Sequence, residues 1–525
     1  MNKIEILDCT LRDGGYINDF AFTERGIRKI INQLTLAGID IVECGFLEDN
    51  NNDKEYSLYT KVEQIKNLLP TDHRNTMYVA MACYGEYDIS QLSNCDGSSI
   101  DGIRVTFHYT EIDGALDYCR CIMEKGYKVF VQPVGTTSYT DEQLISLIKS
   151  VNELNPYAFY LVDTLGLMHQ KDVLRFFYLI DHNLKKSIHM GFHSHNNLQL
   201  SYSNCQALVN VESDRVISLD SSVYGMGRGA GNLNTELIAS YLNEHRKCMY
   251  EIEPILEIVD EFIINIKKEH EWGYSVPYYL AAINGCHPNY AGYLSSKHTL
   301  NVKSISTILR MIEPEHRSLF NKTLAEEKYK EFQARDVDDT QSINYLFQKL
   351  NGKNILLIAP GKSIKSRVDE IKQCAKENDC IVVAISFVPE FIECEFIFLS
   401  NLKRYKTTFN PNGKSIKLIH TSNICVSDND PIVVNYSSLL NSDDVILDNS
   451  SLMFLNLLAK ISPAKVYIAG MDGYDVSLDN YYSERLRIGG DVEKANELNI
   501  AISRRLKQLN NLLQIEFITP TKYNF

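Results

Sequence analysis

The chain has 525 residues, 44% hydrophobic and 23% charged, a composition typical of a soluble globular protein that is too long for a single core. Its formal net charge of −14 argues against general binding to nucleic-acid polymers or to anionic membranes. The 13 cysteines lack paired or metal-type spacing, and no apolar run reaches membrane-spanning length. Because the N-terminus opens directly on a strand pattern, with no signal peptide, we expect a cytoplasmic protein with free thiols.

Short apolar strands alternate with amphipathic helical patterns, such as Glu24–Leu36 and Asp141–Leu154, up to about residue 245. The predicted strands are Ile4–Cys9, Ile39–Gly45, Met77–Ala82, Gly102–Phe107, Lys128–Pro133, Ala158–Asp163, Ser187–His193 and Arg215–Ser221. This alternation is typical of a parallel sheet covered on both faces. Eight units over about 240 residues predict a (β/α)8 TIM barrel in residues 1–245. A doubly wound open sheet is the alternative, but the first turn lacks the glycine spacing of a nucleotide site.

The remainder of the chain divides into two parts. Residues 246–340 are predicted to form a helical extension that completes the active site, followed by a linker. Residues 341–525 are predicted to form a second, Rossmann-like α/β domain, beginning with the apolar run Asn354–Ile358. Its further predicted strands are Cys380–Ile385, Phe396–Leu399, Lys417–His420, Asp444–Leu447, Val466–Ala469 and Ile515–Ile518.

In a barrel of this kind, functional side chains gather at the carboxyl ends of the strands. The polar residues at those ends are Arg12 and Asp13, Glu43, Arg104 and His108, Gln132, Asp163, and His193 and His195. The eighth strand leads into a glycine-rich loop, Gly225-Met-Gly-Arg-Gly-Ala-Gly-Asn232. Such glycines permit close approach of the backbone to a ligand, although a flexible loop is the simpler interpretation. We expect Gly227 and Arg228 of this loop, with Arg104, Gln132 and Asp163, to contact substrate.

The run His193-Ser-His195 indicates a metal site, because alternate residues of a strand point to one face. Asp13 at the end of the first strand would complete a facial set of two histidines and a carboxylate. Asn232 could add an amide oxygen. This mixed nitrogen and oxygen set suits an octahedral Mn²⁺, with Mg²⁺ or Co²⁺ as alternatives, better than structural zinc. The simpler interpretation is that one histidine caps a loop and the other packs.

Three motifs in order carry a resemblance to a known superfamily: Leu7-Asp-Cys-Thr-Leu-Arg-Asp-Gly-Gly-Tyr16, Gly191-Phe-His-Ser-His-Asn-Asn197 and the glycine-rich loop. They resemble the DRE-TIM metallolyases (HMGL-like, pyruvate carboxyltransferase domain), and within these the 4-hydroxy-2-oxovalerate aldolase branch. The resemblance implies that Asp13, His193 and His195 bind the metal, with Asn232 nearby, and that Arg12 stabilises enolate charge. It also implies cleavage or formation of a 4-hydroxy-2-oxo acid from pyruvate enolate and an aldehyde.

The sequence departs from that branch at Tyr16, where the aldolases carry a histidine that acts as base. A tyrosine is a poor base at neutral pH because its usual pKa is about 10. His108 and His287 are the alternative bases, and Tyr290 in the helical extension matches the tyrosine that the family uses as an acid. A packing role for Tyr290 is the competing interpretation. The departure affects the identity of the substrate more than the class of reaction.

In the C-terminal domain, Gly361, Ser363, Gly470 and Asp472 weakly resemble the loops of a Rossmann-like family with sialyltransferase-like members. They are predicted to line a nucleotide or nucleotide-sugar pocket, and the domain pairing suggests surface-polysaccharide biosynthesis. Two other functions stay open: a Claisen-type synthase joining an acyl-CoA to a 2-oxo acid, and an inactive barrel with a nucleotide-binding C-terminal domain. Assembly into a homo-oligomer is also left open.

Overall fold

The computed structural model describes residues 3–49, 53–297, 299–334, 336–408, 416–424, 432–475, 480–482 and 495–525. They form two compact units, of which the first is Met1–Gly292 with Glu313–Phe320. The second is Tyr293–Ile312 with Asn321–Phe525. The predicted domain limits at 245 and 340 divide the chain differently.

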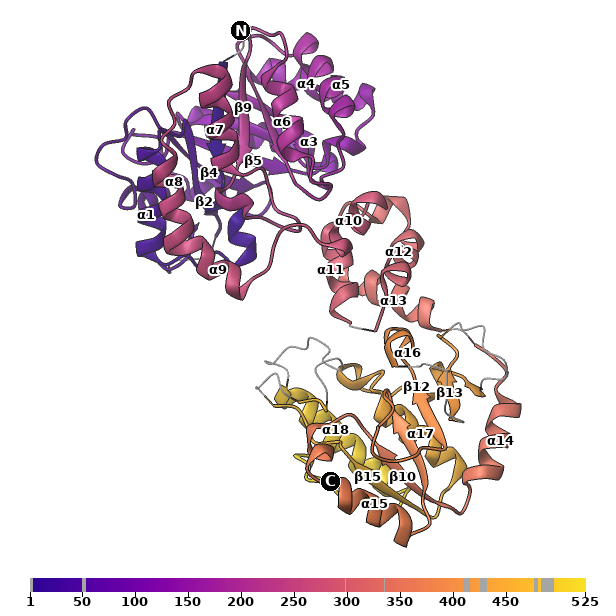
Figure 1. The fold of residues 1–525 in the computed structure, drawn as a ribbon. Coiled ribbons are helices and arrows are strands. Elements are labelled where there is room, and N and C mark those ends of the chain that lie inside the picture. The colour runs from indigo at the N-terminus through magenta and orange to yellow at the C-terminus, as the bar shows by residue number, and fades with distance from the viewer. Residues whose placement is uncertain are drawn as a thin grey trace. The chain divides into compact units, whose positions relative to one another are not determined.

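Eight parallel strands of the first unit close into a barrel, which confirms the predicted (β/α)8 fold (Figure 1). They are β1 (Lys3–Asp8), β2 (Ile41–Leu47), β4 (Met77–Cys83), β5 (Gly102–Phe107), β6 (Lys128–Pro133), β7 (Ala158–Asp163), β8 (His189–Ser194) and β9 (Val216–Ser221). Strand β1 closes the barrel by pairing with both β9 and β2. A two-residue strand that the sequence did not indicate, β3 (Leu58–Tyr59), adds to β2 outside the ring.

Helices between the strands cover the outside of the barrel (Figure 1). They are α1 (Glu24–Leu36), α2 (Val62–Lys66), α3 (Ile112–Glu124), α4 (Asp141–Leu154), α5 (Gln170–Asn183), α6 (Ser201–Val209) and α7 (Thr235–Arg246). Helix α4 shows how the sequence sets such an element. Thr140 and Gln143 form a capping box at its start, and Asn155 ends it in the left-handed conformation. Its apolar side chains lie at helical spacing, so one stripe is buried against the strands.

The first unit continues beyond the barrel through α8 (Ile252–Ile258), a π-helical turn (Val259–Ile263), α9 (Ile264–Glu269) and α10 (Val276–Ile283). Helix α8 packs against α1 and α7, so this part of the predicted extension belongs to the barrel's own packing. Helix α11 (Pro288–Ser296) crosses the boundary between the units, while α12 (Val302–Met311) and α13 (Lys322–Gln333) belong to the second.

The second unit contains a seven-stranded parallel sheet in the order β14-β13-β12-β11-β10-β15-β16, which agrees with the predicted Rossmann-like domain. The strands are β10 (Asn354–Ile358), β11 (Ile381–Ile385), β12 (Phe396–Leu399), β13 (Lys417–Thr421), β14 (Ile432–Val434), β15 (Lys465–Ala469) and β16 (Ile515–Phe517). The strand predicted at Asp444–Leu447 is wrong. Asp443 caps the amide of Val445, and Asp444–Ile446 forms a 3-10 turn instead. Strand β14 was not predicted.

Helices cover both faces of this sheet: α14 (Thr340–Leu350), α15 (Val368–Glu377), α16 (Leu402–Thr408), α17 (Ser450–Ile461) and α18 (Ala495–Asn510). Strand β10 shows why both faces are buried. Ile355 and Leu357 pack in the core that contains α14, α17 and α18, whereas Leu356 and Ile358 pack in the core that contains α15. Among the described residues, no helix combines the length and apolarity needed to cross a bilayer.

A buried arginine fixes the end of α5 against the barrel, and its loss should destabilise the first unit. The Arg215 guanidinium donates to Asp181 Oδ1 at 2.7 Å and to the carbonyl oxygens of Lys185, Ile188 and Leu184. We predict that Arg215→Met lowers the free energy of unfolding by about 3–5 kcal/mol, because several buried acceptors lose their donor. Urea unfolding followed by the fluorescence of Trp272, the chain's single tryptophan and a buried residue of this unit, measures the change.

The matched control is Arg120→Met. Arg120 lies on α3 and pairs with Asp117 at the surface, so its loss should change the unfolding free energy by less than about 0.5 kcal/mol. Equal effects of the two variants would contradict the role given to Arg215.

Candidate metal centre

Asp13 reaches the mouth of the barrel through a tight turn at the end of β1. The backbone amides of Arg12 and Asp13 both donate to the carbonyl oxygen of Cys9, at 3.1 and 2.8 Å. The Cys9 amide in turn donates to the Ser221 carbonyl of β9, which ties the turn to the neighbouring strand. Consecutive side chains are therefore held at the carboxyl end of the barrel, where sites of this fold lie.

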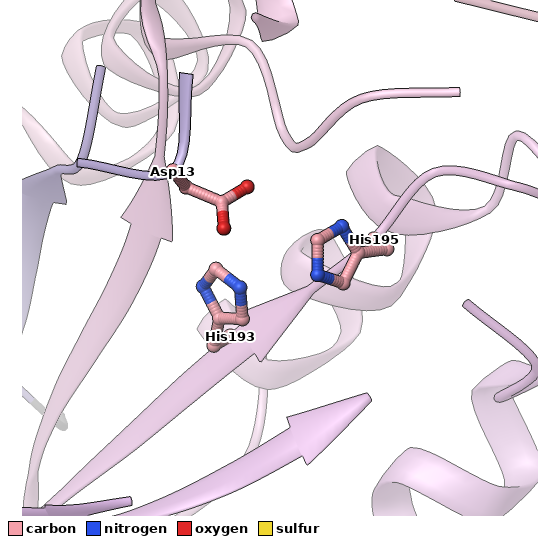
Figure 2. Close-up of side chains that lie close together, drawn as sticks. All are labelled: Asp13, His193 and His195. Carbon is pink, nitrogen blue, oxygen red and sulfur yellow. The ribbon is translucent and has the colours of Figure 1, made fainter. Parts of the chain in front are cut away.

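The three predicted ligands come together. One ligand atom from each of Asp13, His193 and His195 lies within 4.8 Å of the others, and Figure 2 shows the three side chains converging. His193 belongs to β8, and His195 follows it by two residues, which places both imidazoles on the same side of the chain. Asp13 and His193 are buried, and His195 is partly buried.

The protonation states of these groups favour cation binding. His193 Nδ1 lies 2.9 Å from Asp220 Oδ2, which leaves Nε2 as the ligand atom. Burial lowers the pKa of His195 to about 3, so its imidazole is neutral at pH 7. Burial alone would raise the pKa of Asp13, but the charge of Arg12, the largest opposing influence, holds it well below its usual range. The set at neutral pH therefore includes the Asp13 carboxylate and the neutral imidazole of His195.

Asn232 completes the group with an amide oxygen. Its Nδ2 donates to Asp13 Oδ2 at 2.6 Å, while its buried Oδ1 has no hydrogen-bond partner among the described residues. Gly227 closes over this pair: a Cβ there would lie 2.4 Å from Asn232 Nδ2 and 2.8 Å from Asp13 Oδ2. An orphaned buried oxygen beside a carboxylate and two imidazoles fits a divalent ion of the Mn²⁺, Mg²⁺ or Co²⁺ type.

Two buried arginines hold this group in place. Arg12 donates through Nε to Glu43 Oε2 at 2.9 Å and through Nη1 to Asp13 Oδ1 at 2.7 Å. Arg104 donates to the same Glu43 oxygen at 2.8 Å and also pairs with Asp220. Each of the two guanidinium groups therefore bridges two carboxylates. Arg12 Nη2 is buried and has no hydrogen-bond partner in the described part of the chain.

Two members of this network were missed as functional residues. Glu43 was noted at a strand end but given no role, and Asp220 was not singled out. The signal that could have found Asp220 is a carboxylate within a barrel strand that has no other charged residue, Val-Ile-Ser-Leu-Asp-Ser. A buried charge of that kind requires a partner.

The residues predicted to contact substrate occupy different positions. Arg104 lies in the network below the metal ligands, fully buried, with its guanidinium over the ring of Tyr160. Gln132 is buried on β6, and its Nε2 has no hydrogen-bond partner among the described residues. The Asp163 carboxylate accepts the amides of Leu167 and Met168, and burial raises its pKa to about 6. Substrate contacts for all three stay predictions.

Tyr16 and Arg228 form a pair beside the metal ligands. The Arg228 guanidinium carbon lies 3.3 Å from the centroid of the Tyr16 ring, and Phe20 packs edge-on against the same ring. Burial raises the pKa of Tyr16, with the charges of Arg228 and Arg12 opposing the rise in part. Tyr16 therefore keeps its proton at neutral pH, which excludes it as a base in that state.

The three other candidates for proton transfer differ in their surroundings. His108 is exposed at the end of β5. His287 precedes α11, and burial together with the charge of Arg228 lowers its pKa to about 4. Its Nδ1 accepts the amide of Asn289, so Nε2 carries the proton of the neutral ring. The Tyr290 hydroxyl lies 3.0 and 3.1 Å from the carbonyl oxygens of His316 and Leu319, which fits a packing contact. The catalytic roles of all three stay predictions.

In the second unit, the four predicted ligand-binding residues meet at the ends of β10 and β15. The Gly361 amide donates to the Gly470 carbonyl at 2.9 Å. The Asp472 carboxylate accepts both the amide and the hydroxyl of Ser363. The order of the strands in the sheet reverses between β10 and β15. In folds of this kind, ligands usually bind at the carboxyl ends of the strands where the order reverses. Because the Ser363 amide and hydroxyl already donate to Asp472, they are not available to a ligand in this arrangement. A nucleotide ligand stays a prediction.

Comparisons with known proteins find relatives of the barrel region. Residues 3–260 match the HMGL-like family model. A 4-hydroxy-2-oxovalerate aldolase of Geobacillus genomosp. 3 is 26% identical over 243 residues, which cover 46% of this chain and 70% of that protein. An oxaloacetate decarboxylase of Mycobacterium tuberculosis is 25% identical over 248 residues, covering 45% and 69%. Among solved structures, the N-terminal domain of a proposed aldolase from Bacteroides vulgatus is 27% identical in sequence to this chain. The match covers 56% of this chain and 96% of that domain, with a TM-score of 0.47.

The bond between Asp220 and His193 leads to a prediction about metal affinity. Replacing Asp220 by asparagine removes the charge that orients the imidazole and strengthens it as a ligand. We predict that Asp220→Asn weakens Mn²⁺ binding about 10- to 100-fold, measured without substrate by the EPR signal of free Mn²⁺.

The control is Asp8→Asn. Asp8 is an equally buried carboxylate on β1 whose partners are Thr10 and Thr235 rather than the ligands. Unchanged Mn²⁺ affinity in Asp220→Asn, or equal loss in both variants, would contradict the assigned role of Asp220.

Proposed function

We propose that this barrel is a divalent-metal-dependent lyase that cleaves or forms a 4-hydroxy-2-oxo acid, with pyruvate enolate and an aldehyde as the other side of the reaction. The match of residues 3–260 to the HMGL-like family model supports this class of reaction. The observation that carries the proposal is Arg12 Nη2, a buried donor left without a partner beside the Asp13, His193 and His195 group. A buried guanidinium edge in that position suits an oxygen that gains negative charge during the reaction.

The roles of the residues around the reacting carbonyl follow from their contacts. A divalent ion held by Asp13, His193, His195 and Asn232 would act as a Lewis acid on the 2-oxo acid. Arg12 donates from Nη2 to the 2-oxo oxygen, and its bonds to Glu43 and Asp13 fix the direction of that donor. Because these groups are in place before reaction, they stabilise enolate charge with little reorganisation.

Tyr16 supplies a proton at the opposite end of the new bond. In condensation, the enolate carbon attacks the aldehyde carbon, the C3–C4 bond forms, and the C4 oxygen takes a proton. The Tyr16 hydroxyl has no hydrogen-bond partner among the described residues and holds its proton at neutral pH. It can therefore donate to the C4 oxygen as charge develops there. Cleavage reverses these steps and requires the same oxygen to lose its proton.

The alternatives have less support. A Claisen-type synthase is disfavoured by the Gly-Arg-Gly sequence of the loop at residues 227–229, and an inactive barrel is disfavoured by the assembled ligand set. Manganese as the ion, a nucleotide at the second unit, a homo-oligomer, the cytoplasm as location and a role in surface-polysaccharide biosynthesis all stay predictions.

The metal ligands provide the first test. We predict that Asp13→Asn and His193→Ala each abolish metal-dependent pyruvate release from a series of 4-hydroxy-2-oxo acids of increasing length, followed with a coupled assay. Both variants should also lose Mn²⁺ binding measured by EPR, since each removes one donor of the facial set. Their unfolding curves, read from Trp272 fluorescence, should stay cooperative. His182→Ala, an exposed histidine on α5, is the control. Full activity in chelator-treated His193→Ala would overturn the proposal.

Tyr16 provides a test of the proton carrier. We predict that Tyr16→Phe lowers the rate of condensation by about 10²-fold or more, because no proton reaches the C4 oxygen. Since burial raises the pKa of Tyr16 above its usual value, the protonated form is present throughout about pH 6–9. The ratio of wild-type to variant rate should therefore be constant over that range and fall only at higher pH. Tyr178→Phe, an exposed tyrosine on α5, is the control. A ratio that rises with pH would instead identify Tyr16 as a base.

A further inference from the structure

Arg228 differs from the other arginines of the site in having no counter-charge. Arg12 and Arg104 each bridge two carboxylates. For Arg228, the described part of the chain offers neither an ion pair nor a side-chain hydrogen bond, although acidic residues outnumber basic ones by 67 to 53 in the sequence. A guanidinium at a ligand site without a carboxylate is a ready receptor for an anion from outside the protein.

The loop that carries Arg228 is tied directly to the metal ligands. Gly227, its neighbour, lies against the Asp13 and Asn232 side chains. The Gly231 amide donates to the Arg228 carbonyl at 3.0 Å, and the Asn196 amide, next to His195, donates to the Gly231 carbonyl at 2.7 Å. Arg228 is therefore held at the rim of the site rather than on a detached loop.

The orientation of the guanidinium leaves its donors available. Its face lies on the Tyr16 ring at 3.3 Å, so that face is used for stacking. The N–H groups lie in the plane of the guanidinium, so stacking does not occupy them, and two of them can bind a carboxylate or a phosphate together. Tyr16 lies within electrostatic range of both Arg228 and Arg12.

We propose that Arg228 binds an anionic group on the aldehyde partner, so that the substrate class is a 4-hydroxy-2-oxo acid with a second carboxylate or a phosphate beyond C4. This inference rests on the proposed function. The 2-oxo acid end lies at Arg12 and the metal ligands, the C4 oxygen lies at Tyr16, and the distal anion lies at Arg228. The three contacts follow the order of the groups along such a substrate.

The competing role for Arg228 is purely structural, as a clamp that holds the Tyr16 ring. The two roles differ in a measurable way. A clamp affects the reaction of every aldehyde equally, whereas an anion receptor affects charged aldehydes far more than neutral ones of the same shape. The ratio of kcat/KM between matched aldehydes is therefore the decisive quantity.

The experiment measures Mn²⁺-dependent condensation of pyruvate with two matched pairs: 4-oxobutanoate against 4-oxobutanamide, and glyceraldehyde 3-phosphate against glyceraldehyde. We expect the wild-type protein to prefer the anion of at least one pair by about 10- to 100-fold in kcat/KM, the usual range for a charge-assisted hydrogen bond. Which pair shows the preference distinguishes a carboxylate from a phosphate. Arg228→Met should reduce the preference to below about threefold, Arg228→Lys should retain part of it, and the surface variant Arg120→Met should leave it unchanged.

Failure of this inference can be told from failure of the proposed function. Exchange of the pyruvate methyl protons for deuterium, followed by NMR, reports enolate formation without any aldehyde. Metal-dependent exchange and condensation, with equal kcat/KM for both members of each pair, would retain the lyase and overturn the anion receptor. A preference that persists in Arg228→Met, or an equal loss for charged and neutral aldehydes, would overturn it as well. Absence of both exchange and condensation in the wild-type protein would overturn the proposed function and the inference that rests on it.

Discussion

The arrangement of side chains at the mouth of the barrel depends on a network of buried ion pairs. Three carboxylates, Asp13, Glu43 and Asp220, are bridged by two guanidinium groups, those of Arg12 and Arg104. All five side chains are almost wholly buried, where an unpaired charge is costly. Counting three negative and two positive charges among these five side chains leaves one negative charge in excess, next to the two histidine ligands. A cation at Asp13, His193 and His195 would offset that excess, so the network that holds the ligands also favours their occupancy.

The same network links groups from separate strands. Glu43 lies on β2, Arg104 on β5 and Asp220 on β9, while Arg12 and Asp13 follow β1. No single local element could fix the Arg12 side chain so firmly, because its orientation depends on carboxylates distant in the sequence. The closed barrel supplies that rigidity through continuous hydrogen-bonded pairing of its strands. It follows that the position of the Arg12 donor is a property of the whole ring of strands, as a preorganised electrostatic site requires.

The sequence could predict the parts of this arrangement that depend on local pattern. Alternation of apolar strands and amphipathic helices gave the barrel, and the His-Ser-His spacing on a strand gave a ligand pair that does converge with Asp13. Features that depend on side chains meeting across the fold were missed. The role of Asp220 follows from its contact with His193, 27 residues away, and the Tyr16 and Arg228 stack joins the first turn to the last loop of the barrel. In the second unit, the apolar pattern after Asp443 predicts a strand, but the Asp443 side chain caps the Val445 amide and starts a 3-10 turn. A pattern of apolar residues contains no information about such a cap.

The stacked pair of Arg228 and Tyr16 also links the charge of Arg228 to the protonation of Tyr16. The positive charge of Arg228 lowers the pKa of Tyr16, against the larger effect of burial. An anion bound to Arg228 would neutralise that charge, and the phenol would then hold its proton more strongly. Condensation needs the proton kept until the C4 oxygen becomes an alkoxide, a much stronger base than a phenolate. Binding the charged aldehyde therefore keeps the Tyr16 proton in place until charge develops on the C4 oxygen, and the stack between Arg228 and Tyr16 connects recognition of the distal anion to that proton.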